Sequence, residues 1–154
     1  MSDRDFLARL ESSGTEEDAL TCILEQFRAD SGTIHLLGED GVLHLRAASA
    51  GIPAAVLGSV RRVPVGKGMA GLAVERVQPV SACNIQTDNS GDVRAGAKAT
   101  GLQGSIVVPI VRDGAAIGAL GIANHRERTF SGEEIELLLI AARTLVRFAA
   151  HGGH

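Results

Sequence analysis

The residues of this chain that could bind a metal are two histidines and a group of polar residues after residue 83. Apolar runs at 33–37 and 42–48 predict a β-hairpin that places His35 opposite His44, and two imidazoles could form half of a metal site. No third ligand is evident nearby, so we interpret the pair as amphipathic side chains on a partly exposed edge. The acidic and amide groups after residue 87 do not follow the spacing of a calcium-binding loop. The sequence therefore predicts no metal and no other cofactor.

A glycine-rich loop could hold an anion. Residues 66–71 read Gly-Lys-Gly-Met-Ala-Gly and open a short helix that is expected to end near Arg76. Free N–H groups at such a helix start can bind a phosphate. The loop lacks both the spacing and the Ser/Thr of a P-loop, and it is not a dinucleotide-binding fingerprint. We therefore interpret Gly71 as a residue that lets this helix pack closely on a sheet.

Length and composition restrict the class of protein. The chain has 154 residues and a net charge of −3, which favours one domain over residues 1–154 and gives no basic footprint for nucleic acid. No apolar run is long enough to span a membrane, and the polar N-terminus is unlike a signal peptide, so we expect a cytoplasmic protein. Aromatic residues make up 3% of the chain, with no Trp or Tyr, so no strand or loop offers a ring on which a base could stack.

The secondary-structure elements that would position a functional site are arranged around residues 105–123. Two apolar runs flank Asp113-Gly114, which is a strong signal for a hairpin with a type I′ turn. Neither run alternates between apolar and polar residues, so both faces of this hairpin should be covered. A two-residue loop predicts the pairs Arg112 with Ala115, Ile110 with Ile117, and Val108 with Ala119.

Helices are predicted at both ends of the chain. One covers residues 2–12, and a second follows Thr15, which has the position of an N-cap with Asp18 three residues later. Ser131 and Glu134 form a capping box for a last helix that is expected to reach Ala150. This helix carries two apolar stripes, so it should pack on the sheet and on a second surface. That surface is either another copy of the chain or the N-terminal helix.

The chain resembles a GAF domain. The segments that carry the resemblance are VPVGKGMAGLAVERVQPVSACNI, TGLQGSIVVPIVRDGAAIGALGIAN and FSGEEIELLLIAARTLVRFAA, together with the helix and hairpin over residues 15–50. The resemblance implies an α+β fold with a central antiparallel sheet of about six strands. Terminal helices would cover one face, and the helix after the glycine-rich loop would close a pocket over the other face with a flap at 83–104. The segments around Met69 and Ile117 would then enclose one hollow.

GAF domains are mostly sensory modules that bind small molecules and dimerise through their terminal helices. By alignment with the cyclic-nucleotide branch, the ligand-binding residues would be Met69, Ala70, Asn84, Ala97, Thr100 and Gly104. That branch carries an acid where this chain has Gly121, and its N-K…F-x3-D-E pattern is altered here at His125 and after Phe130. These departures and the scarcity of aromatic residues argue against cyclic AMP or GMP.

An enzymatic branch of the family, the free methionine-(R)-sulfoxide reductases, needs a nucleophilic and a resolving thiol. Its motif has cysteine where this chain has Ala70 and again near Lys98. Cys83 could still support redox chemistry, which predicts thiol oxidation by methionine sulfoxide that is lost in Cys83→Ser. Cys22 lies on a helix and is poorly placed to resolve Cys83. A haem or bilin role would depend on His44 or Cys83, and the lack of aromatic residues argues against it.

The sequence as a whole favours a dimeric sensor with a small-molecule pocket, without a complete catalytic constellation. GAF-like segments account for nearly the whole chain, so an output activity is expected either in a separate signalling protein or in a part of the protein outside this sequence. Two alternatives stay open. One is a redox enzyme that uses Cys83, and the other is a dimerisation scaffold with a vestigial pocket.

Overall fold

The computed structural model describes residues 3–50, 52, 54–82, 84, 86 and 101–152. The elements in chain order are α1 (Asp3–Glu11), α2 (Glu16–Phe27), β1 (Ser31–Leu37), β2 (Val42–Ala48), α3 (Ala54–Val60), β3 (Arg62–Pro64), α4 (Gly68–Arg76), β4 (Val80–Ala82), β5 (Ser105–Arg112), β6 (Ala115–Ala123), α6 (Gly132–Thr144) and α7 (Val146–Gly152). Nothing in these ranges is a helix of the length and apolarity that crossing a bilayer requires.

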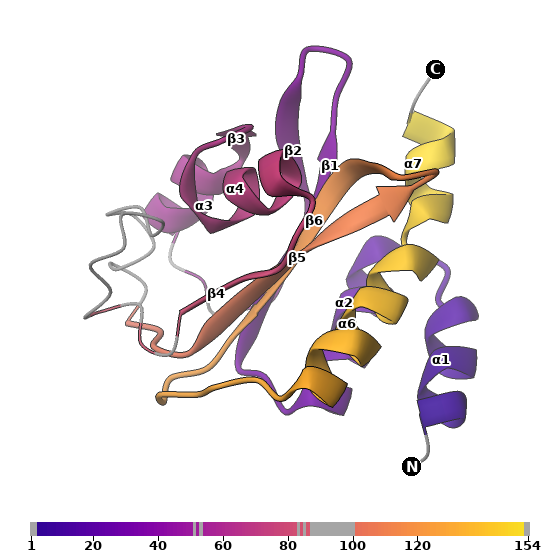
Figure 1. Cartoon of the computed structure of the whole chain (residues 1–154), viewed down its shortest axis with the longest axis vertical. Helices are drawn as coiled ribbons and strands as arrows, with labels where there is room; N and C mark the ends of the chain where they lie inside the picture. The colour runs from indigo at the N-terminus through magenta and orange to yellow at the C-terminus, as the bar shows by residue number, and fades with distance from the viewer. Residues whose placement is uncertain are drawn as a thin grey trace.

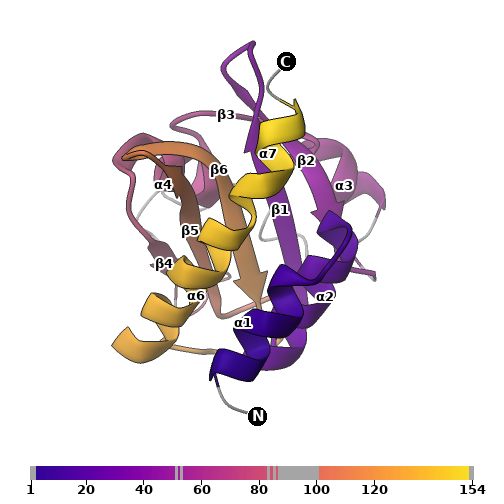
Figure 2. The same cartoon turned by 90° about the vertical axis from the view of Figure 1, so that its right-hand side faces the viewer.

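The strands of the described residues form one antiparallel sheet of six strands in the order β3-β2-β1-β6-β5-β4. Figure 1 shows the sheet between two layers of helices: α3 and α4 lie on one face, and α1, α2, α6 and α7 lie on the other. Figure 2 shows the second layer from the front, with α1 beside α6 and in front of α2. The predicted α+β class, the strand number and the placement of the terminal helices are therefore confirmed.

The β5–β6 hairpin has the predicted turn but a different register. Asp113 and Gly114 have φ of 51° and 81°, which is the positive pair that a type I′ turn requires, and Arg112 pairs with Ala115. Beyond this point the prediction was wrong, because Ile110 pairs with Gly118 and Val108 with Leu120. Ile117 is the extra residue of a β-bulge between these pairs, and it shifts the rest of β6 by one position.

The bulge decides which side chains lie on each face of the sheet. The large side chains of β5 and β6, such as Ile106, Val108, Leu120 and Ile122, join the core beneath the terminal helices. The small residues Ala119 and Ala123 face α4 in a second core, together with Met69 and Val107. Because side chains alternate along a strand, the bulge gives the α4 face a floor of small residues.

The β1–β2 hairpin also differs from its predicted register. Its loop contains Gly41 with a φ of 77°, and Leu37 pairs with Leu43 instead of Val42. His35 therefore lies opposite Leu45 and not opposite His44. His35 is buried, whereas the half-exposed His44 side chain contacts Asp40 with Nε2 2.9 Å from Oδ2. The shifted register refutes both interpretations of a facing histidine pair.

The terminal helices form as their caps predict. Thr15 Oγ1 accepts a hydrogen bond from Asp18 N at 3.1 Å, and the capping box of Ser131 and Glu134 is complete. The predicted single helix to Ala150 was wrong, since it is interrupted at Leu145. There the Leu145 N–H bonds to the Ala142 carbonyl, three residues back, which tightens the chain and ends α6.

The N-terminal helix α1 packs against both α2 and α6. Phe6 and Leu10 of α1 are fully buried, and the ring of Phe6 meets Phe27 edge-on with centroids 6.0 Å apart. Arg147 of α7 closes the contact, because its Nη2 donates hydrogen bonds to the carbonyls of Leu10 and Ser13 at 3.0 and 2.7 Å. The sequence left open whether the last helix packs on another copy of the chain or on the N-terminal helix. In the structure, the N-terminal helix α1 contacts α6.

Candidate functional site

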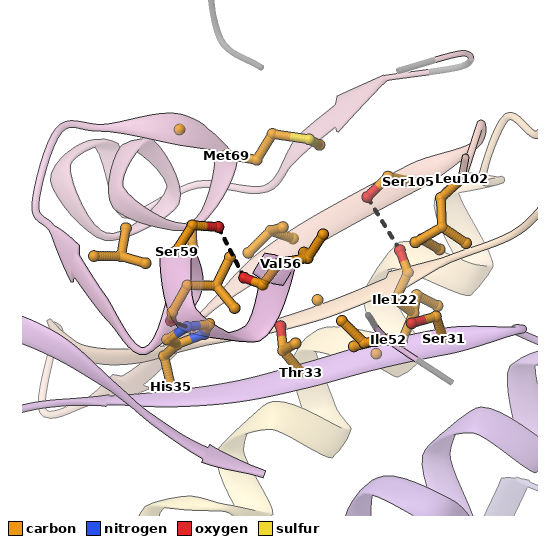
Figure 3. A pocket seen from close by; sticks show the side chains of 18 of the residues that line it. Ser31, Thr33, His35, Ile52, Val56, Ser59, Met69, Leu102, Ser105 and Ile122 are labelled. Atoms are coloured by element: carbon orange, nitrogen blue, oxygen red, sulfur yellow. Dashed lines mark hydrogen bonds between the residues drawn. The ribbon is translucent and has the colours of Figure 1, made fainter. Parts of the chain in front are cut away.

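A cavity of about 250 Å³ lies between the sheet and the layer formed by α3 and α4. Its lining comes from the strands β1, β3, β5 and β6, from α3, from the start of α4, and from three residues outside these elements, Ile52, Lys67 and Leu102 (Figure 3). The lining residues are Ser31, Gly32, Thr33, His35, Ile52, Val56, Ser59, Val60, Val63, Lys67, Gly68, Met69, Ala70, Leu102, Ser105, Val107, Gly121, Ile122 and Ala123.

The floor of the cavity is built from rows of residues that run across β1, β6 and β5. One row is Ser31, Ala123 and Ser105, and the next is Thr33, Gly121 and Val107. The middle strand contributes only a methyl group or a hydrogen atom to each row. The backbone of β6 is therefore within reach of whatever occupies the cavity, which is a common reason for glycine in a strand.

The side of the cavity formed by β1 is polar. Thr33 and His35 are two residues apart on this strand, so their side chains lie on the same face, and Figure 3 shows them next to each other below α3. Ser105 Oγ, across the floor, donates a hydrogen bond to the Ile122 carbonyl at 3.3 Å. The opposite side is apolar, with Val107, Leu102 and Met69 each at most 8% exposed.

His35 connects the floor to α3. Its Nε2 lies 2.8 Å from the carbonyl oxygen of Val60, the last residue of α3. A carbonyl can only accept, so Nε2 carries the proton and Nδ1 of the neutral ring is left as an acceptor. Burial lowers the pKa of His35 below its usual value and outweighs the bond to Val60, which keeps the ring neutral. Nδ1 itself is buried and has no hydrogen-bond partner within the described ranges.

The start of α4 forms the roof of the cavity. Gly66 and Gly68 have φ of 90° and 64°, and these values turn the chain from β3 into α4. A methyl group at Gly71 would clash with the Pro64 carbonyl oxygen, which confirms the interpretation that Gly71 permits close packing. The first helical bond of the loop runs from Gly71 N to Lys67 O, so the N–H groups of Gly68, Met69 and Ala70 are not used within the helix.

The structure places the predicted ligand-binding residues in different surroundings. Met69 and Ala70 line the cavity. Asn84 does not, and its Nδ2 donates to Glu127 Oε1 at 3.1 Å. Gly104 is also outside the lining and packs against Arg128. Ala97, Thr100 and Cys83 lie outside the described residues.

The sequence prediction missed the polar side of the cavity, namely Ser31, Thr33, His35 and Ser105. A signal for three of them was present, because polar residues occupy every second position from Ser31 to His35. The predicted hairpin register instead assigned His35 to an exposed edge. The hollow also lies farther along β6 than predicted, over Gly121 and Ala123, while Ala116 and Ala119 pack directly into the core around α4.

Asn124, which matches the asparagine of the cyclic-nucleotide pattern, has a structural role. It is 2% exposed, and its Nδ2 donates to the Arg28 carbonyl at 2.8 Å. Its Oδ1 accepts from Arg128 Nη1 at 2.7 Å, and Arg128 Nη2 also donates to Glu134 Oε2 at 2.8 Å. The guanidinium of Arg128 stacks over Phe130 at 4.4 Å. These contacts join the end of β6 to α2 and α6, and they leave Asn124 outside the cavity lining.

Metal chemistry needs a cluster of ligands and redox chemistry needs a reactive thiol, and Cys22 is the one cysteine in the described part of the chain. The residues of this part contain no cluster of three His, Cys, Asp or Glu side chains suited to a metal ion. Cys22 is buried in the core on the α2 side of the sheet, across from the cavity, and burial raises the pKa of its thiol. Cys22 is therefore neither a reactive thiolate nor within reach of the cavity.

A family model described as "GAF domain" matches residues 15–147. No curated protein sequence gives a significant match. Among solved structures, the GAF domain of an Acinetobacter phosphoenolpyruvate-protein phosphotransferase has a TM-score of 0.76 and 21% identity, covering 97% of this chain and 90% of that chain.

Two further structures have related folds. The free methionine-R-sulfoxide reductase of Neisseria meningitidis, in complex with its substrate, has a TM-score of 0.76 and 22% identity, covering 96% of this chain and 89% of that chain. The second is a domain of a protein from Sinorhizobium meliloti that is described as a putative two-component sensor histidine kinase. It has a TM-score of 0.69 and 22% identity, covering 90% of this chain and 97% of that chain.

Proposed function

Because the chain belongs to the GAF domain family, we propose that it is a sensory module for signal transduction that binds a small molecule in the cavity beneath α3 and α4. The observation that carries the proposal is the cavity itself. Its volume is about 250 Å³, and its floor has no side chain at Gly121. Ligand sites are typically concave and mostly apolar, with a few polar groups that orient the ligand. The side formed by β1 provides such groups.

We assign the ligand contacts to two surfaces. Met69 and Ala70 would contact the ligand from the roof, and Thr33, His35 and Ser105 would contact it from the floor. Asn84, Ala97, Thr100 and Gly104 remain proposed contacts on the family resemblance alone. No side chain of the described lining carries a negative charge, and Lys67 is its one cation. These features favour a neutral or anionic ligand over a cation.

The wider assembly is also part of the proposal. Several apolar side chains of α6 and α7 stay only partly buried even though α1 packs beside α6, among them Ile135, Leu139 and Phe148. A homodimer through the terminal helices would cover them. The sensor would then act on a separate signalling protein. Native mass spectrometry of freshly purified protein measures the oligomeric state and detects any ligand that is retained during purification.

The experiment that tests binding is a thermal-shift screen of the protein against a metabolite panel, followed by titration of each hit. A specific ligand at 100 times its Kd should stabilise the fold by about 2.7 kcal/mol. Ala70→Leu adds bulk to a lining residue and should abolish the shift, whereas Ala115→Leu adds the same bulk at an exposed hairpin position and should not. If no compound gives a shift, the cavity is vestigial and the chain is a scaffold. If Ala70→Leu shifts like the wild type, the ligand binds outside this cavity and the proposed site is wrong.

A further inference from the structure

Two buried side-chain atoms of the described residues have no hydrogen-bond partner: Oε2 of Glu16, which forms an ion pair with Arg46, and Nδ1 of His35. Nδ1 of His35 is buried, has no hydrogen-bond partner and belongs to a residue that lines the cavity. His35 as a whole is 3% exposed. Buried polar groups in native proteins nearly always have a partner, so an exception of this kind calls for an explanation.

The tautomer of His35 defines what that partner must be. The Val60 carbonyl fixes the proton on Nε2, so Nδ1 presents a lone pair and can only accept. The neighbouring hydroxyls do not fill this role. Ser59 Oγ donates to the Val56 carbonyl at 2.8 Å, and Ser105 Oγ donates to the Ile122 carbonyl. The missing partner is therefore a hydrogen-bond donor.

The rest of the cavity limits the charge and shape of that donor. A cationic donor would find no carboxylate in the described lining, so its charge would be buried without a partner. Gly121 separates Thr33 of the polar side from Val107 of the apolar side. A molecule with one polar edge and one apolar face would therefore fit across the floor.

We propose that the ligand is an uncharged molecule that donates an N–H or O–H hydrogen bond to Nδ1 of His35 and lays its apolar body over Gly121 towards Val107 and Met69. Primary amides and alcohols on a small aliphatic or ring body belong to this class. This inference rests on the proposed binding function and specifies the chemistry of the same cavity. It also makes His35 a specificity-determining residue that contacts both the ligand and the end of α3.

Two substitutions separate the roles of the two ring nitrogens. In His35→Gln the side-chain amide nitrogen can replace Nε2 as the donor to Val60, while the acceptor at Nδ1 is lost. In His35→Asn an amide oxygen can replace Nδ1, while the bond to Val60 is lost. A purely structural histidine would make the asparagine variant the more damaged of the two and would leave ligand preference unchanged in both.

The experiment compares cyclohexanecarboxamide with cyclohexyl methyl ketone, which has the same shape but no donor, by titration of wild type and both variants. The preference for the amide over the ketone should be about tenfold larger in wild type than in His35→Gln, which is the worth of one hydrogen bond. His35→Asn should keep the preference. In ¹⁵N-histidine-labelled wild type, the Nδ1 resonance should move upfield with the amide and stay in place with the ketone.

Equal preference in wild type and His35→Gln, or an Nδ1 resonance that does not respond to the amide, would overturn the inference and leave the proposed cavity function standing. If neither probe binds the wild type, the inference is overturned as well, and the metabolite panel decides the proposed function separately. The spectroscopic measurement uses the wild type alone, so a variant that fails to fold does not remove the test.

Discussion

The perturbation that most directly probes how this fold is held together is Asn124→Ala. Asn124 is 2% exposed and lies where the end of β6 meets α2 and the loop before α6. The substitution removes a neutral hydrogen bond to the Arg28 carbonyl and a charge-assisted bond from Arg128. It leaves the Arg128 side chain, which is 10% exposed, without this acceptor.

The expected loss follows from these two bonds. A neutral hydrogen bond contributes about 1 kcal/mol and a bond to a charged group about 2 kcal/mol, so the free energy of unfolding should fall by about 3 kcal/mol. For a domain of this size, 1 kcal/mol corresponds to about 2–4 °C in Tm, which gives a decrease of about 6–12 °C. Differential scanning calorimetry measures both quantities.

A matched control is Asn84→Ala, because Asn84 is also an asparagine that bonds a side chain of the 124–129 loop but is only partly buried. In this variant the free energy of unfolding should fall by less than about 1 kcal/mol. Asn124→Asp adds a second test. It keeps an acceptor for Arg128 but faces the Asp30 carboxylate, whose Oδ2 is 3.3 Å from Asn124 Nδ2, and so it should also destabilise. If Asn124→Ala and Asn84→Ala lower Tm equally, the proposed role of the network is refuted.

Two further predictions concern His35 and Arg147. Since burial lowers the pKa of His35 in the folded state, the unfolded chain binds the extra proton first, and stability should fall as the pH drops below about 6.5 towards the folded pKa. Urea unfolding between about pH 5 and 8 measures this slope, and a slope of the same size in His35→Gln would contradict the assignment. Arg147→Met should remove the two charge-assisted bonds to the end of α1 and, at about 2 kcal/mol for each, lower the free energy of unfolding by about 4 kcal/mol. Hydrogen exchange should then quicken within residues 3–11, and unchanged exchange there would show that apolar packing alone holds α1.

Much of the fold could be predicted because its signals are local. Both capping interactions, at Thr15 and at Ser131, depend on residues three positions apart, and both form. The turn at Asp113-Gly114 depends on two residues that tolerate positive φ. The family resemblance, carried by longer segments, supplied the order of the elements and the two helical layers.

The candidate site was only partly predictable. Met69 and Ala70 follow from the resemblance, since the helix after the glycine-rich loop closes the pocket in that fold. Thr33 and His35 were missed because their role depends on the register of the first hairpin, which was predicted one residue away from its actual position. A shift of the pairing register by one residue moves every side chain of a strand to the other face of the sheet. Because of this error, the polar side of the cavity was not predicted.

The sequence by itself determined the elements of this protein, their caps and turns, and its membership of a family, because these depend on neighbouring residues or on long matching segments. The tertiary structure decided where the hollow lies and what it presents. Ile117 becomes the extra residue of a bulge only when β6 packs between β1 and β5, and this bulge turns Gly121 and Ala123 towards α4. The buried acceptor of His35 likewise exists only because the end of α3 lies above it. Both features arise from contacts between segments that are distant in the chain, which no local pattern encodes.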